Sequence, residues 1–153
     1  MQSYEERLTA PRSWWLIAFL LGVAGGLALL PLGTVAMLGG LIVTGVLAAA
    51  GVSSYGSARI RVVQGSLVAG DARIPVSALG VPEPLDAEEA RAWRSYKADP
   101  RAFMLLRGYV TTALRVEVTD PADPTPYVYL STRDPEALAE ALEQARTAER
   151  DQA

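Results

Sequence analysis

The stretch "LALLPLGTVAML", residues 27–38, interrupts a long apolar segment with Pro31, Leu32 and Gly33. As one straight helix, the apolar segment 14–52 would be about 58 Å long. The hydrocarbon core of a bilayer is only about 30 Å thick, and about 20 helical residues span it. Pro31 lacks an N–H donor, and Gly33 readily adopts the backbone angles that end a helix. The break therefore predicts two short helices joined by a tight turn.

Charge is excluded from this part of the chain. No charged residue occurs between positions 13 and 58, and all 14 Lys and Arg and all 17 Asp and Glu lie outside this window. This pattern predicts two membrane-spanning helices, 13–30 and 34–52. A cleaved signal peptide is disfavoured because the second apolar segment follows the first at once. A buried hairpin of a soluble protein is disfavoured because neither segment has a polar face.

Basic residues flank the apolar pair at both ends. Arg7 and Arg12 precede it, Arg59 and Arg61 follow it, and the turn between the helices carries no charge. Basic flanks remain in the cytoplasm, so we expect a two-pass protein of the plasma (cell inner) membrane with both termini cytoplasmic. The predicted parts are a cytoplasmic N-terminal segment (1–12), a transmembrane hairpin (13–53, turn at 31–33) and a cytoplasmic β domain (59–150).

Small residues recur every four positions in both apolar segments. Such stripes allow two helix backbones to approach closely, which is how membrane helices pack. We expect them to pack the two helices on each other, and a homodimer interface is the less favoured alternative. The stripes consist of Ala18, Gly22 and Gly26 in the first segment and of Ala36, Gly40, Thr44 and Ala48 in the second.

After the hairpin the hydrophobic pattern changes to period two. The strands Arg59–Val63, Ser66–Ala69 and 72–76 are predicted, separated by the hairpin turns Gln64-Gly65 and Gly70-Asp71. Further strands are predicted within the segments "AFMLLRGYV", "TALRVEVTD" and "YVYLSTR".

Two helices are predicted among these strands. Asp86 followed by Glu89 is a capping-box pattern that begins a short helix, and Asp134-Pro135 begins a longer amphipathic one. The fold class expected is α+β: a transmembrane hairpin followed by a small antiparallel sandwich or barrel closed by the C-terminal helix. The pleckstrin-homology-like fold has this order of elements, an analogy that concerns the fold and not the ligand.

Four segments carry a resemblance to a known family: "YEERLTAPRSWW", "GDARIPVSALG", "LDAEEARAWR…ADPRAF" and, most specifically, "RVEVTDPADPTPYVYLSTRDPEALAEAL". From Tyr4 to about Ala145 the chain resembles a family of actinobacterial membrane proteins known only as a domain of unknown function. The resemblance implies a two-helix anchor and a cytoplasmic domain in an actinobacterial cell membrane. It implies no activity, cofactor or catalytic residue.

Composition argues against several classes of function. The chain has no cysteine and no histidine, which removes thiol chemistry and the commonest general base and metal ligand. The net charge of -3 is not that of a nucleic-acid-binding protein. We therefore expect a non-enzymatic protein without cofactor or metal. An enzyme using carboxylates such as Glu88 or Asp120 is the least favoured hypothesis, and Asp120, Asp123 and Asp134 are interpreted as turn and cap residues rather than as a calcium site.

Two groups of residues are candidate contacts with a partner or a lipid headgroup. Thr132 and Arg133 precede a helix N-terminus, where an anion could bind. Trp93 lies among Arg94, Lys97 and other basic residues, as a membrane-surface contact requires. For both groups a purely structural role is the favoured interpretation. The function expected is a membrane-anchored interaction or scaffold module with an unidentified protein partner, and the alternative is phospholipid-headgroup binding by the β domain.

Overall fold

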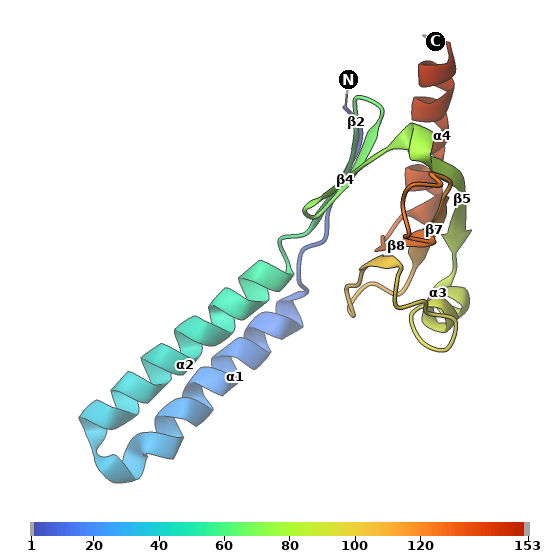
Figure 1. Ribbon diagram of the computed structural model, residues 1–153. Helices are drawn as coiled ribbons and strands as arrows, with labels where there is room; N and C mark the ends of the chain where they lie inside the picture. Colours follow the sequence, from blue (N-terminus) through green and yellow to red (C-terminus); the bar gives the residue numbers. More distant parts are fainter. Residues whose placement is uncertain (1, 152–153) are drawn as a thin grey trace. The chain divides into compact units, whose positions relative to one another are not determined.

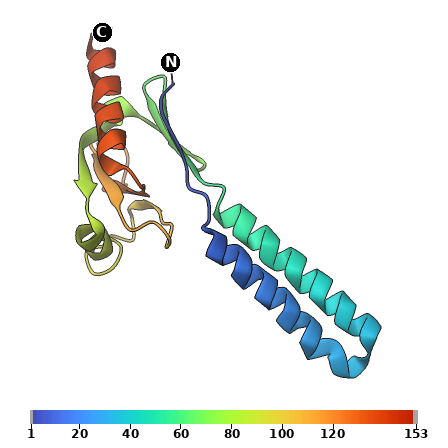
Figure 2. The same ribbon diagram turned by 180° about the vertical axis from the view of Figure 1, so that it is seen from behind.

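The computed structural model describes residues 2–151 and the side chains of residues 4–151. The chain forms two compact units. One unit joins Met1–Leu8 to Arg59–Ala153, and we call it the β unit; the other is Thr9–Ala58, which we call the helical unit. Figure 1 and Figure 2 show both units from opposite sides.

The helical unit is an antiparallel helical hairpin. Helix α1 (Arg12–Leu29) ends in a 3-10 turn, η1 (Leu30–Leu32), and helix α2 (Thr34–Tyr55) follows Gly33. Gly33 has a φ of 107°, a conformation that few other residues adopt. The predicted break in the apolar segment is confirmed, and both helices are long and apolar enough to cross a membrane, by length and composition.

Small residues hold the two helices close together. Gly22 and Gly26 are buried on α1, and a Cβ atom added to Gly40 of α2 would lie 2.6 Å from the carbonyl oxygen of Gly25. The predicted packing of the small-residue stripes within the hairpin is confirmed. At the open end of the hairpin the rings of Trp14 and Tyr55 stack, with centroids 5.3 Å apart.

The first sheet of the β unit, sheet A, has the strand order β1-β2-β3-β4. All its strands are antiparallel, and Arg7 in β1 lies opposite Arg59 in β2. The predictions of β2 and β3 are confirmed, and β4 ends one residue earlier than predicted. Strand β1 was not predicted. The strands are β1 (Gln2–Arg7), β2 (Arg59–Val63), β3 (Ser66–Ala69) and β4 (Ala72–Pro75).

The helical unit is thus inserted between two paired strands. Strand β1 precedes α1, β2 follows α2, and the two strands pair from Gln2↔Val63 to Arg7↔Arg59, with a register shift between Gln2 and Tyr4. The hairpin of helices takes the place of the loop that would otherwise connect β1 to β2.

The second sheet, sheet B, has the order β5-β7-β8-β6, with β6 parallel to β8. The predicted antiparallel sandwich or barrel is therefore corrected in two respects: sheet B is mixed, and the two sheets do not close into a barrel. Pro82 and Pro84 supply one reason, because a strand that lacks these N–H donors is confined to a sheet edge. The strands are β5 (Leu79–Leu85), β6 (Phe103–Leu105), β7 (Ala113–Val118) and β8 (Tyr127–Ser131).

Three helical segments complete the β unit: η2 (Val76–Ala78), α3 (Ala87–Trp93) and α4 (Pro135–Arg150). The predicted caps are confirmed, because the side chain of Asp86 accepts from Glu88 N and Glu89 N, and that of Asp134 accepts from Ala137 N. Helix α4 contacts both sheets, β1 and β2 on one side and β5 and β7 on the other. Its buried residues Leu138 and Leu142 therefore belong to a core shared by the two sheets.

Candidate functional site

One cluster of candidate residues forms around Trp93, the last residue of α3. The guanidinium carbon of Arg115, from β7, lies 4.2 Å from the centroid of the Trp93 ring and 5.0 Å from that of Tyr127. The two rings meet edge to face, with centroids 5.3 Å apart. The Lys97 ammonium lies 5.5 Å from the Trp93 centroid. Cations in these positions are attracted by the negative face of the aromatic ring.

The cation at the centre of this cluster is neutralised by its neighbours. Arg115 forms ion pairs with Glu83 of β5 at 2.9 Å and with Glu117 of β7 at 3.0 Å. The three residues lie on adjacent strands, since Glu83 pairs directly with Arg115. Arg115 therefore fixes the Trp93 ring to the sheet. Lys97 is exposed, and Arg94, the C-cap of α3, is half-buried.

Thr132 and Arg133 form a second cluster, around the carboxylate of Glu6. The Thr132 hydroxyl donates to Glu6 Oε2 at 2.5 Å, and the backbone N–H of Arg133 donates to Glu6 Oε1 at 3.0 Å. The Tyr4 hydroxyl also donates to Glu6 Oε2, at 3.1 Å. Thr132 is buried, whereas Arg133 is exposed. The chain's own carboxylate thus accepts hydrogen bonds before the helix N-terminus, at the position where an external anion was the less favoured interpretation.

The two clusters do not form one site. Tyr127, which contacts Trp93, is the first residue of β8, and Thr132 follows its last residue. At about 3.3 Å per residue they lie about 17 Å apart along the strand. The structure therefore brings Trp93 and Lys97 together, with Arg94 beside them, and places Thr132 and Arg133 at the opposite end of the sheet.

The comparison with known proteins identifies the chain by family. Residues 3–142 match the family described as Protein of unknown function (DUF3093). The chain belongs to this family. No curated protein and no solved structure shows significant similarity to it.

In this member of the DUF3093 family, burial changes the acidity of two tyrosines in the β unit. Burial, with a contribution from the charge of Glu6, raises the pKa of Tyr4 to about 12. Burial also raises the pKa of Tyr129, whose hydroxyl donates to the backbone oxygen of Ala90 at 3.0 Å. Both phenols stay protonated at neutral pH and act as hydrogen-bond donors rather than as bases.

The aspartates beside prolines have the turn and cap roles that were predicted. Asp120 and Asp123 each accept a hydrogen bond from the backbone two residues ahead, and Asp134 caps α4. Among residues 2–151, no group of three or more His, Cys, Asp or Glu side chains is placed to hold a metal ion.

Sequence reasoning missed Arg115, Tyr127 and Glu6. The alternation in "ALRVEV" marks Arg115 and Glu117 as solvent-facing residues of a strand, but it does not reveal the aromatic rings beside them. No local sequence pattern indicates the role of Glu6, because its hydrogen-bond partner Thr132 is 126 residues away in the sequence.

Proposed function

We propose that this protein is a two-pass membrane protein that holds a non-enzymatic interaction module, the β unit, at the inner face of the cell membrane. The hairpin of α1 and α2 is the proposed anchor, and both termini are proposed to be cytoplasmic. The β unit is proposed to be an open variant of the pleckstrin-homology-like fold, with two four-stranded sheets followed by a C-terminal helix.

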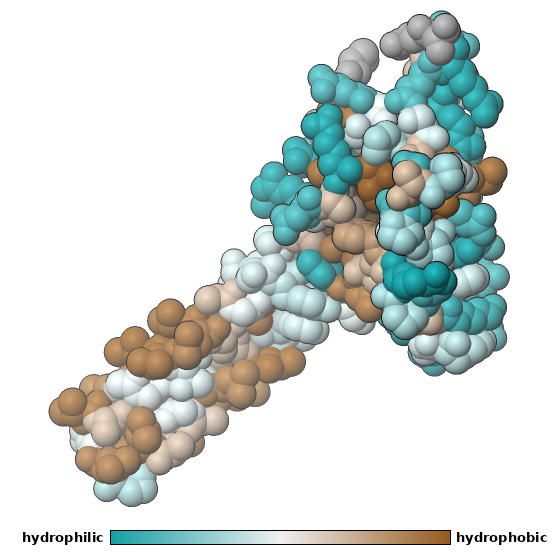
Figure 3. Space-filling view, viewed as in Figure 1, coloured by the Kyte–Doolittle hydropathy of each residue, from teal (hydrophilic) through white to brown (hydrophobic). Residues whose placement is uncertain are grey.

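The surface of the hairpin supports membrane insertion. Large apolar side chains cover it, and several are mostly exposed, such as Phe19 at 66% and Val35 at 86%. Figure 3 shows hydrophobic residues over the hairpin and hydrophilic ones over most of the visible face of the β unit. Soluble proteins rarely expose apolar patches of this extent, so a bilayer is the environment that suits this surface.

The pairing of β1 with β2 is the observation that carries the proposal. Strands on opposite sides of a bilayer cannot pair, so the register from Gln2↔Val63 to Arg7↔Arg59 supports an even number of crossings between them. The two helices between β1 and β2 supply two crossings. The basic residues Arg7, five residues before α1, and Arg59, four residues after α2, favour the cytoplasmic side for both strands.

The same pairing argues against a cleaved signal peptide. Cleavage after α1 would remove β1 from the edge of sheet A and would remove Glu6 from its hydrogen bonds with Thr132 and Arg133. The buried Thr132 hydroxyl would then lack its acceptor, which is costly in a protein interior.

The surface around Trp93 supports the interaction role. Tyr96 is 82% exposed, and it lies beside Lys97 and Arg94 at the end of α3. Tyr, Trp and Arg are the residues most enriched among energetically important interface positions. The proposed occupant is a protein partner. Phospholipid-headgroup binding is the alternative function, supported by the cations of the same surface.

The topology can be tested by labelling single cysteines, because the native chain has none. We expect Leu32→Cys, in the turn, to react with an impermeant maleimide in intact cells and Gln144→Cys, on α4, to react only after permeabilisation. A Gln144→Cys variant that reacts in intact cells would refute the cytoplasmic location.

The interaction role can be tested with a photo-crosslinking amino acid at position 96 of the full chain in its own membrane. We expect a protein adduct that is weakened by Trp93→Ala and absent when the crosslinker is at position 144. Adducts to lipid alone would favour headgroup binding instead.

A further inference from the structure

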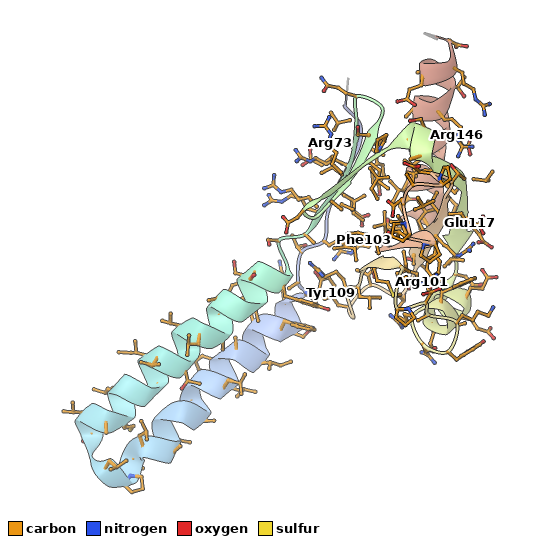
Figure 4. All side chains as sticks on the ribbon, in the orientation of Figure 1. Arg73, Arg101, Phe103, Tyr109, Glu117 and Arg146 are labelled. Carbon is orange, nitrogen blue, oxygen red and sulfur yellow. The ribbon has the colours of Figure 1, made fainter. Side chains whose placement is uncertain are left out.

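One face of sheet A is lined by arginines. Arg7 lies opposite Arg59, and Arg61 pairs with Val68, which pairs in turn with Arg73. Directly opposed residues share a face, and residues two apart in a strand share it too. These four arginines therefore project from the same side, which we call the arginine face. Figure 4 shows Arg73 on the side of sheet A away from sheet B.

The arginine face carries an excess of positive charge that the chain itself does not neutralise. Within residues 2–151, none of its four arginines forms an ion pair. The strands place one carboxylate on this face, that of Glu5, opposite Arg61. Arg7 and Arg59 are like charges in direct opposition, an arrangement that destabilises a sheet unless an anion lies between them.

Two other parts of the β unit differ from the arginine face in how their arginines are balanced by carboxylates. Helix α4 has four glutamates and two arginines, and one of these arginines, Arg146, is bound to backbone oxygens of β5 and to Glu143. Around Trp93 the carboxylates of Glu83 and Glu117 neutralise Arg115. Four arginines thus share one face of sheet A in a chain whose net charge is -3.

The arginine face is also tied by short segments to the proposed membrane anchor. Arg7 lies five residues before the first residue of α1, and Arg59 lies four residues after the last residue of α2. At no more than about 3.6 Å per residue, the chain keeps Arg7 within about 18 Å and Arg59 within about 14 Å of these helix ends.

We propose that the arginine face binds the anionic phospholipid headgroups of the membrane in which the hairpin is anchored. Guanidinium groups match phosphate oxygens with paired hydrogen bonds, and juxtamembrane basic clusters are attracted to anionic leaflets. A headgroup phosphate near Arg7 and Arg59 removes the repulsion between them. This inference rests on the proposed membrane anchoring. It assigns the lipid contact to sheet A rather than to the Trp93 surface or to Arg133.

The test uses the full chain in lipid nanodiscs, with one fluorophore on Val68→Cys at the centre of the face. Nanodiscs of phosphatidylcholine are compared with nanodiscs that also contain phosphatidylglycerol, and both carry a headgroup-linked quencher. We expect stronger quenching with phosphatidylglycerol, and we expect high salt to abolish the difference. At an anionic surface, each arginine raises the ratio of docked to undocked β unit about fivefold. Arg61→Gln with Arg73→Gln should therefore lower this ratio roughly 30-fold.

A matched control removes the same charge elsewhere in the β unit. Arg91→Gln with Arg150→Gln changes two exposed arginines outside sheet A, and we expect quenching of the Val68→Cys label to stay as in the native background. A label on Gln144→Cys reports α4, and we expect its quenching to respond less to lipid charge. The salt series on the otherwise native chain tests the proposal without any arginine substitution.

The outcomes separate this inference from the proposed function. A chain that does not co-purify with nanodiscs of either composition overturns both. A chain that inserts, but whose Val68→Cys label is quenched equally in both lipids at low salt, overturns only the lipid contact. Equal losses of quenching in the sheet A variant and in the Arg91 and Arg150 control also overturn it, because net charge would then explain the effect.

Discussion

The carboxylate of Glu6 accepts a hydrogen bond from the buried hydroxyl of Thr132 at 2.5 Å, although the two residues are 126 positions apart. Glu6 belongs to β1, the strand that leads into the helical hairpin, and Thr132 lies between β8 and α4. This contact joins the N-terminal strand directly to the end of sheet B.

Removing the hydroxyl from position 132 should therefore loosen the β unit. We expect Thr132→Val to lower the free energy of unfolding by about 1 kcal/mol, because the half-buried Glu6 carboxylate loses one of its donors. Thr132→Ser keeps the hydroxyl and should cost clearly less. Denaturant unfolding of the full chain in detergent, followed by Trp93 fluorescence with Trp14 and Trp15 changed to Phe, measures both. Equal losses in the two variants would contradict the role of the hydrogen bond.

The phenol of Tyr4 should make the β unit sensitive to alkali. Its pKa is raised to about 12 in the folded protein, from an ordinary value of 10.0, so the folded state holds this proton more tightly. The unfolded state then binds fewer protons between pH 10 and pH 12, and stability should fall as the pH rises through this range. The contribution is complete below pH 10.

The variant Tyr4→Phe isolates this effect from the other alkaline titrations. We expect its stability to fall less steeply than that of the native chain between pH 10 and pH 12. Unfolding midpoints measured across the range give the two slopes. Parallel slopes would show that Tyr4 titrates alike in the folded and unfolded states.

Arg115 should be difficult to replace even by another cation. Its planar guanidinium lies on the Trp93 ring and forms ion pairs with Glu83 and Glu117, which one ammonium group cannot reproduce. We expect Arg115→Lys to cost about 1 kcal/mol and to shift the Trp93 emission. Lys97→Gln, which changes an exposed cation over the same ring, should cost less than half as much. A larger loss of stability at Lys97 would show that Lys97, rather than Arg115, is the main cation that stabilises the Trp93 ring.

Two neighbouring glycines in α2 should respond to alanine in opposite ways. A Cβ atom at Gly40 would lie 2.6 Å from the Gly25 carbonyl oxygen, whereas a Cβ atom at Gly39 meets nothing within 4 Å. We expect Gly40→Ala to destabilise the hairpin by about 1–3 kcal/mol, and Gly39→Ala to leave it unchanged or slightly more stable. Thermal unfolding in detergent distinguishes them. Similar behaviour of both variants would mean that α1 and α2 do not pack as described.

The sequence predicted the elements whose signals are local. Pro31 and Gly33 located the turn, Asp86 and Asp134 located two helix starts, and the alternation from Arg59 located β2 and β3. Each of these depends on the backbone preferences of a few neighbouring residues. Such preferences act in the same way whatever the rest of the chain does.

The elements that were missed depend on distant partners. Strand β1 reads "QSYEER", with almost no apolar residue, and is held in place by β2, which follows the whole hairpin. Strand β5 contains Pro82 and Pro84, which argue against a strand unless it lies at an edge. The parallel pairing of β6 with β8 requires a crossover that no local pattern reveals.

The candidate site was predicted only in part, for the same reason. Trp93 and Lys97 lie four residues apart around the end of α3, and their contact follows from local structure. Glu6 and Arg115 act through other strands, so their roles appear only once the sheets are assembled. A role of any of these residues in binding a headgroup or a partner stays a prediction.

The insertion of the hairpin between β1 and β2 also fixes an order of events during synthesis. Strand β1 leaves the ribosome before both helices, but its partner β2 leaves only after them. In a membrane, β1 must therefore remain unpaired until α2 has crossed back, and sheet A can be completed only then. If only one of the two helices crosses, β1 and β2 lie on opposite sides of the membrane, so a folded β unit would exclude a hairpin that is only half inserted.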